Sequence, residues 1–110
     1  MREIKFKIWD KGNDEWKIFN LKGLHESGVT YHLDYSKVCQ FTGLKDKNGK
    51  EIYEGDIFQD DEDGSCESVE WDNEFGGWST QAWYSVGEFA QCASELEVIG
   101  NIYENPELLN

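Results

Sequence analysis

Apolar and polar residues alternate over the first ten positions of the chain. Ile4, Phe6 and Ile8 fall on one face of an extended backbone, and lysines occupy the positions between them. This period of two is typical of a strand with one buried face. Turn-forming residues follow at 10–14 and a second extended pattern at 15–19. The pattern therefore predicts an N-terminal β-hairpin.

Short extended segments recur along the rest of the chain, separated by turn residues. Asn48-Gly49 is the dipeptide best suited to a two-residue hairpin turn, and it precedes the apolar pair Ile52-Tyr53. The acidic run 60–64 cannot pack against apolar surface and is predicted as a solvated turn. Further strands are predicted from β-branched, aromatic or alternating residues at 29–33, 37–41, 57–58, 67–71, 78–84 and 96–103. Gly100 indicates a bulge or a close backbone approach in the last of these strands.

Helical spacing of apolar residues is confined to 86–93, and Pro106 is placed to open a final helical turn. The predicted fold class is therefore mainly β: a small barrel-like or sandwich arrangement of short antiparallel strands, with at most one or two short helices. A chain of 110 residues is expected to form one domain spanning residues 1–110. A division of that domain into two β lobes, at about 1–40 and 41–110, stays open.

Composition supports a folded, water-soluble protein. The 5 Trp, 5 Tyr and 6 Phe residues carry large apolar areas and can build a core. No run approaches the roughly 18 apolar residues of a membrane span, and the N-terminus lacks the apolar stretch of a secretory signal. The three cysteines, Cys39, Cys66 and Cys92, form no close pair and are expected to be free thiols. We therefore expect the chain in the cytosol of its producer.

Charge divides the chain into two unlike halves. Residues 1–50 hold all 10 Lys and Arg with 7 acids, for a net charge of +3. Residues 51–110 hold 16 acids and no Lys or Arg, for a net charge of −16, so the whole chain carries −13. Such a field repels phosphate backbones from the C-terminal half and favours cationic partners. A surface charged only for solubility is the simpler alternative.

Three blocks of sequence carry a resemblance to a known family. They are REIKFKIWDK at 2–11, FTGLKDKNGKEIYEGDI at 41–57 and EVIGNIYENPELL at 97–109. Together they resemble the YopX family of phage and prophage proteins across nearly the whole chain. Phe41 stands where the family more often has Tyr, and 59–94 carries no family motif beyond scattered aromatic residues.

This resemblance implies a mainly β protein encoded by a bacteriophage or prophage, in the cytoplasm of a bacterial host, without an assigned activity. The glycines and apolar residues of the motifs are expected to specify turns and core, not chemistry. The variable stretch is then the part of the chain in which partner specificity would lie.

Signals for catalysis or cofactor binding are weak, and no enzymatic activity, cofactor or metal is predicted. Residues 59–70 match the calcium-loop pattern at Asp61, Asp63, Gly64 and Glu70, but position 1 is Gln59 and the flanks are strands. A solvated hairpin is the preferred interpretation. His25 and His32 could pair with Cys39 as base and nucleophile, but no local signature frames them.

The alternative function is a β-rich module associated with nucleic acid. Direct binding of nucleic acid is not expected. It would use N-terminal lysines for phosphates and two tryptophans for base stacking, namely Lys5, Lys7, Lys17, Lys45, Lys47, Lys50, Trp9 and Trp16. A net charge of +3 is small for that purpose, and the adjoining −16 lowers affinity for phosphate.

The leading hypothesis is a non-enzymatic accessory protein that inhibits or modulates a basic host or phage protein. Acids that share a face could imitate a phosphate array, and aromatic residues among them, including Phe75 and Trp83, could anchor the contact. The predicted partner-binding residues are Asp60, Asp61, Glu62, Asp63, Glu67, Glu70, Trp71, Asp72, Glu74 and Trp78. Homo-oligomerisation stays open.

Overall fold

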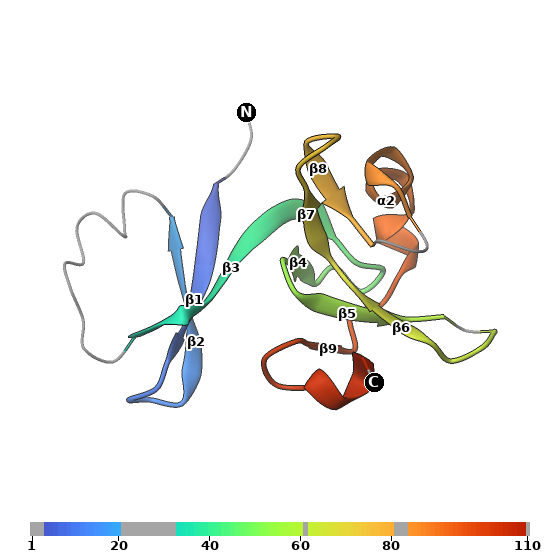
Figure 1. Ribbon diagram of the computed structural model, residues 1–110. Helices are drawn as coiled ribbons and strands as arrows, with labels where there is room; N and C mark the ends of the chain where they lie inside the picture. The colour runs from blue at the N-terminus through green and yellow to red at the C-terminus, as the bar shows by residue number, and fades with distance from the viewer. Residues whose placement is uncertain (1–3, 21–32, 61, 81–83, 110) are drawn as a thin grey trace.

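The computed structural model describes residues 4–20, 33–60, 62–80 and 84–109 (Figure 1). All strand pairings are antiparallel, and they form sheets in the orders β2-β1-β3-β4, β6-β5-β9 and β7-β8. The strands are β1 (Lys5–Asp10), β2 (Glu15–Asn20), β3 (Leu33–Lys45), β4 (Glu51–Tyr53), β5 (Asp56–Gln59), β6 (Cys66–Ser68), β7 (Glu70–Asp72), β8 (Gly77–Ser79) and β9 (Gly100–Asn101). One short helix, α2 (Val86–Cys92), and the 3-10 turns Ala93–Glu95 and Pro106–Leu109 complete the described parts. The mainly β fold class is confirmed, and the described strands do not close into a barrel.

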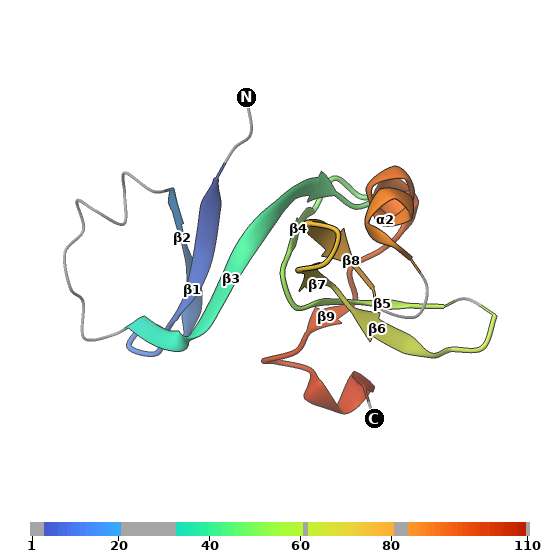
Figure 2. The same ribbon diagram turned by 45° about the horizontal axis from the view of Figure 1, so that its top comes forward.

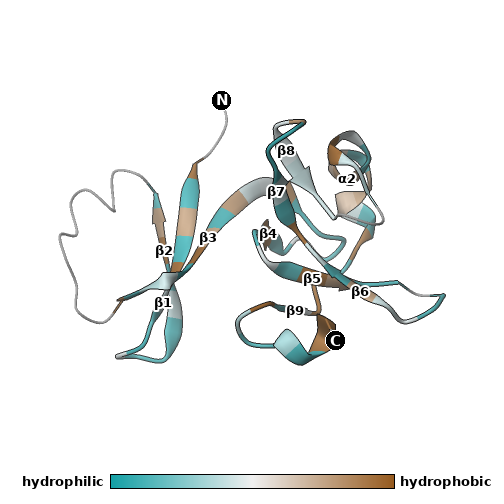
Figure 3. Ribbon diagram, in the orientation of Figure 1, coloured by the Kyte–Doolittle hydropathy of each residue, from teal (hydrophilic) through white to brown (hydrophobic). Residues whose placement is uncertain are grey.

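The N-terminal hairpin is confirmed, with β1 and β2 paired from Lys5↔Asn20 to Asp10↔Glu15. Asp10 holds its turn, because its carboxylate accepts hydrogen bonds from the backbone N–H groups of Gly12 and Asn13. Apolar and polar residues alternate visibly along β1 (Figure 3). These local signals were sufficient because a hairpin needs only neighbouring residues.

Strand β3 is longer than the strand predicted at 37–41 and includes Leu33, the last residue of the strand predicted at 29–33. It runs without interruption from Leu33 to Lys45 and links the N-terminal sheet to the rest of the molecule (Figures 1 and 2). Residues 29–32 lie outside the described part. The register shifts between Phe41 and Lys45, where Gly43 has a φ of 87°. That bulge lets the strand pass from pairing with β1 to pairing with β4.

The predicted turn at Asn48-Gly49 is present, within a longer connection than two residues. Gly49 adopts a φ of 80°, and its N–H donates to the carbonyl of Asp46 at 3.0 Å. Buried Asp46 also accepts from the backbone N–H groups of Asn48, Lys50 and Val98. Burial alone would raise the pKa of Asp46, but these donors outweigh it and lower the pKa below its usual value. Asp46 thereby ties the turn to the C-terminal segment.

Three predicted strands differ in extent from the prediction. The segment 67–71 divides into β6 and β7 at Val69, because the backbone of buried Val69 bonds to Gly55 and Asp56 instead of continuing the hairpin. The segment 96–103 keeps only β9, where Gly100 lies so close to Asn105 that a Cβ atom would come within 2.5 Å of its side chain. The close approach predicted at Gly100 is therefore confirmed. Of the segment 78–84, Gly77–Ser79 is β8, Thr80 and Tyr84 form an isolated bridge, and 81–83, with Trp83, lies outside the described part.

The predicted short helix is confirmed as α2. Ser85 caps its N-terminus in a capping box with Glu88, and Phe89 points its fully buried ring into the core. The main core cluster joins strands and helix through Ile52, Phe58, Val69, Trp78, Phe89, Ala93 and Val98. The expected turn at Pro106 is also present. No described helix is long and apolar enough to span a membrane.

Candidate functional site

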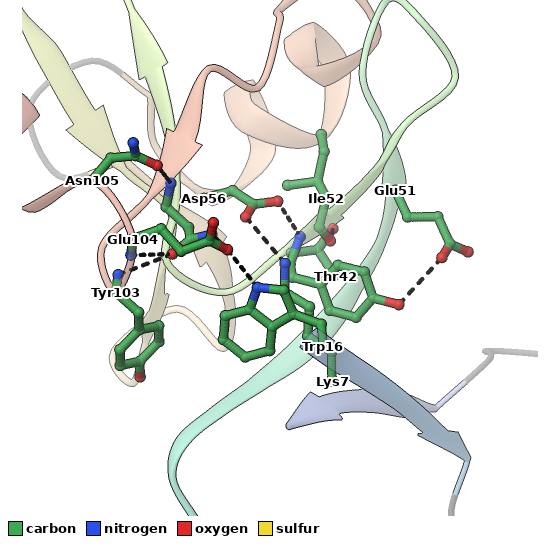
Figure 4. A network of polar contacts seen from close by, with 11 residues as sticks. Lys7, Trp16, Thr42, Glu51, Ile52, Asp56, Tyr103, Glu104 and Asn105 are labelled. Carbon is green, nitrogen blue, oxygen red and sulfur yellow. Dashed lines mark hydrogen bonds and ion pairs between the residues drawn. The ribbon is translucent and has the colours of Figure 1, made fainter. Parts of the chain in front are cut away.

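The lysines of β1 lie between the N-terminal sheet and the rest of the chain. Lys5 Nζ contacts Glu51 Oε2 at 2.5 Å and lies 4.6 Å from the centre of the Phe41 ring. Lys7 Nζ lies 3.8 Å from Asp56 Oδ1 and 4.7 Å from the centre of the Tyr53 ring. Figure 4 shows Lys7 and Asp56 from close by. The alternation was predicted correctly, but the lysine face packs against the C-terminal part instead of facing solvent.

Asp56 is the most deeply buried charged group of this junction, with 2 % of its surface exposed. Its Oδ2 accepts a hydrogen bond from the backbone N–H of Tyr53 at 2.8 Å. Burial raises the pKa of Asp56, and the nearby Lys7 ammonium and the Tyr53 N–H oppose that rise. The charge of the buried Asp56 carboxylate is therefore stabilised by the Lys7 ammonium and the Tyr53 N–H.

Trp16 extends the junction from β2. Its Nε1 donates to Glu104 Oε1 at 2.6 Å, and its ring packs against Tyr103 and, edge to face, against Trp9. The hydrogen bond from Trp16, with a second from Asn101, lowers the pKa of Glu104. Trp16 is thereby committed to contacts within the chain.

These contacts engage several residues that the nucleic-acid alternative would need. Lys5, Lys7 and Trp16 bind partners within the chain, and Trp9 packs edge to face against Trp16. Lys17 and Lys47 form ion pairs with Glu15 and Glu97 on the surface. Lys45 and Lys50 are exposed.

The predicted acidic residues fall into two turns that lie apart. Asp60, Glu62 and Asp63 belong to the turn between β5 and β6, whereas Asp72 ends β7 and Glu74 lies in the turn that follows it. Figures 1 and 2 both show these turns at different places on the molecule. Asp61 lies outside the described part, and Glu67 and Glu70 are half-buried in β6 and β7.

The turn between β5 and β6 connects two antiparallel strands, as the hairpin interpretation of this segment predicted. The Asp60 carboxylate accepts from the N–H of Glu62, and Asp63 accepts from the N–H of Ser65. Gly64 has a φ of 73°, which closes the turn. Among the described residues, no three His, Cys, Asp or Glu side chains gather where they could hold a metal ion.

The β7–β8 hairpin separates its aromatic residues from its acids. Trp71 pairs across the strands with Trp78, and their rings meet edge to face at 5.1 Å. Since neighbouring residues of a strand alternate between faces, Glu70 and Asp72 lie on the face opposite the two tryptophans. Trp78 is buried, whereas Trp71 is 39 % exposed and Phe75, in the turn, is 71 % exposed. The predicted residues of this hairpin therefore do not form one continuous surface.

A pocket of about 220 Å³ lies beside the two tryptophans. Three elements line it: β3 with Thr42 and Leu44, the β7–β8 hairpin, and helix α2 with Val86, Phe89 and Ala90. Trp78 lines this pocket, and its buried Nε1 has no hydrogen-bond acceptor among the described residues. The prediction from sequence named both tryptophans but missed the pocket. The helical spacing of 86–93 was the available signal, since it placed Val86, Phe89 and Ala90 on one face.

Cys39 does not have the properties of a reactive thiol. It is fully buried in a cluster with Phe41 and Tyr53, and burial raises its pKa to about 12. The two histidines considered with it lie outside the described residues. Cys66 and Cys92 are half-buried free thiols.

The fold and these features define a small mainly β protein with antiparallel sheets and one short α-helix in its described part. The model of the YopX protein family matches residues 1–110, so the chain belongs to the YopX family. In structure it is similar to protein EF1440 from Enterococcus faecalis, at a TM-score of 0.59 and 22% identity, covering 97% of this chain and 98% of that one. That likeness shows a shared fold. No protein with a curated description matches the chain.

Proposed function

We propose that this YopX-family protein is a non-enzymatic accessory protein of a phage or prophage, which binds a basic host or phage protein in the bacterial cytoplasm. The β7–β8 hairpin carries the proposal, because it exposes Trp71 and Phe75 in the half of the chain that has no Lys or Arg. Exposed aromatic residues are typical anchors of protein interfaces. The surrounding charge would steer a cationic partner toward them.

Two further observations support this proposal over its alternatives. Lys7 and Trp16, which a nucleic-acid site would use, are engaged in contacts within the chain. The buried thiol of Cys39, whose pKa is raised to about 12, is a poor nucleophile. The proposed binding role requires neither a free Lys7 or Trp16 nor a reactive Cys39.

Capture of partners from a lysate of a bacterial host tests the proposal. The lysate is treated with nuclease, and bound proteins are identified by mass spectrometry and then purified and titrated directly. We expect a basic protein to bind the unmodified chain and to be lost with the double variant Trp71→Ala/Phe75→Ala.

The matched control is Ile18→Ala/Tyr35→Ala, which removes two exposed apolar side chains outside the hairpin. It should retain the partner. Capture of no basic protein at low salt, or equal loss with both double variants, contradicts the proposal. Tight binding of a single-stranded oligonucleotide would support the nucleic-acid alternative instead.

A further inference from the structure

The pocket beside Trp71 and Trp78 has the size of a site for one side chain. An engineered apolar cavity of about 150 Å³ binds a benzene molecule, and this pocket measures about 220 Å³. Its apolar lining comes from Leu44, Val86 and Phe89 together with the two indole rings. A leucine or phenylalanine side chain would therefore fit and would be shielded from water on several sides.

Close approach of the hairpin to the helix shapes this pocket. A Cβ atom on Gly77 would come within 2.2 Å of Val86 Cγ1, so only glycine permits the present spacing of β8 and α2. Gly76, which also lines the pocket, has a φ of 67° and no atom within 4 Å of its Cβ position. The backbone on this side of the pocket is consequently open to an approaching chain.

Trp78 adds a polar requirement to this apolar site. Trp78 is only 7 % exposed, and its indole N–H lacks an acceptor in the described part of the chain. A buried donor without an acceptor is destabilising by about 1–3 kcal/mol. Because Nε1 itself is closed to solvent, a small shift of the indole ring would let a peptide carbonyl that entered with the bound side chain accept from it.

We infer that this pocket binds an apolar side chain presented by a lysine- or arginine-rich segment of the partner protein, with Trp78 Nε1 donating a hydrogen bond to that segment's backbone. The inference rests on the proposed function. Charge selects the segment, because residues 51–110, which supply all of the pocket's lining except Thr42 and Leu44, contain 16 acids and no Lys or Arg.

Titration of the 15N-labelled full chain with short peptides tests the inference. The probes are a pentapeptide with four lysines around a central leucine, its alanine analogue, and an analogue with four glutamines around leucine. Indole N–H resonances are assigned by single Trp→Phe variants. We expect the leucine–lysine peptide to shift the Trp78 indole N–H saturably, and each analogue to bind about tenfold more weakly.

A pocket-filling variant provides the structural control. Ala90→Phe places a ring in the pocket from the exposed side of α2 and should weaken binding of the leucine–lysine peptide about tenfold. Gln91→Phe adds the same ring at an exposed position of α2 that does not line the pocket, and should leave binding unchanged.

The possible failures separate this inference from the proposed function. Equal binding of the leucine and alanine peptides, unaffected by Ala90→Phe, overturns the pocket and leaves binding of basic segments intact. Equal binding of the glutamine peptide overturns the choice of a basic segment. No binding by any peptide at millimolar concentration overturns the pocket inference, while the partner captured from lysate still decides the proposed function independently.

Discussion

Replacing Lys7 by methionine should destabilise the protein strongly, because it leaves the Asp56 charge without its partner. Lys7 Nζ and Asp56 Oδ1 are 3.8 Å apart, and their side chains are only 12% and 2% exposed. Unit charges at about this distance attract by about 4 kcal/mol at the effective dielectric constant suited to proteins. Methionine keeps the apolar stem and can contact the Trp16 and Tyr53 rings through sulfur. The charge is therefore the main thing removed.

We expect Lys7→Met to lower the free energy of unfolding by about 3 kcal/mol at pH 7, as for other broken buried pairs. Urea unfolding followed by tryptophan fluorescence measures this loss. With an m-value of about 1.5 kcal/mol/M, the midpoint should fall by about 2 M. Lys17→Met, which breaks an exposed pair with Glu15, is the control and should leave the midpoint nearly unchanged.

A second substitution shows whether the lost stability comes from the stranded charge. Asp56→Asn removes the charge and keeps an oxygen that can accept from the N–H of Tyr53. The double variant Lys7→Met/Asp56→Asn should then be within about 1 kcal/mol of the unmodified protein, far from the sum of the single losses. Additive losses, or a Lys7→Met variant as stable as the unmodified protein, would refute the account of the junction.

Acid should rescue the Lys7→Met variant. Burial already raises the pKa of Asp56 above the ordinary 3.8, and loss of Lys7 removes the main opposing effect. A raised folded-state pKa means that the stability due to protonated Asp56 is fully present below 3.8 and is lost as pH rises through the folded-state value. The difference between variant and unmodified protein should therefore shrink as pH is lowered from 7 toward 4. A constant difference over that range would contradict the assignment.

Three further outcomes follow from the fold. Gly77→Ala should destabilise the protein by about 2 kcal/mol or more, because the new Cβ would collide with Val86. Gly87→Ala, in open space on the same helix as Val86, should stabilise the protein by about 0.5 kcal/mol. Urea unfolding midpoints of the two variants measure both effects. A thiol reagent should modify two cysteines quickly in the folded protein and the third, Cys39, only after unfolding, as counted by mass spectrometry. Far-ultraviolet circular dichroism and tryptophan fluorescence should report one coincident unfolding transition if the chain is a single domain, and two transitions if it forms independent lobes.

Elements set by neighbouring residues were predictable from the sequence. The β1–β2 hairpin, the turn at Gly49 and helix α2 each carry their own turn residues or cap, such as Ser85 with Glu88. Elements that depend on distant partners were not predictable in extent. Strand β3 stays extended through two successive pairings, and β7 begins where Val69 turns to bond with Gly55 and Asp56. Nothing local to these segments encodes those contacts.

The lysine face of β1 shows a second limit of pattern reading. A period of two reveals that a strand has two unlike faces, but it does not reveal which face meets water. Lys5 and Lys7 face carboxylates and aromatic rings from other strands in place of solvent. The acids that pair with them, Glu51 and Asp56, belong to the motif shared with the YopX family. Part of the negative charge of the C-terminal half is therefore structural.

The same reasoning narrows the acidic surface available for a partner. Acids that are dense in sequence are not dense on the surface, because consecutive residues of β7 point to opposite faces and the two acidic turns lie apart. The seven described acids among the predicted residues therefore do not form one phosphate-like array. What lies in one place is an exposed Trp71 and a pocket lined by Trp71 and Trp78, in the half of the chain that has no Lys or Arg. A partner that binds this surface needs an apolar side chain as well as positive charge. Its affinity should therefore fall as salt is added, but part of the binding should remain at salt concentrations that dissociate a purely electrostatic complex.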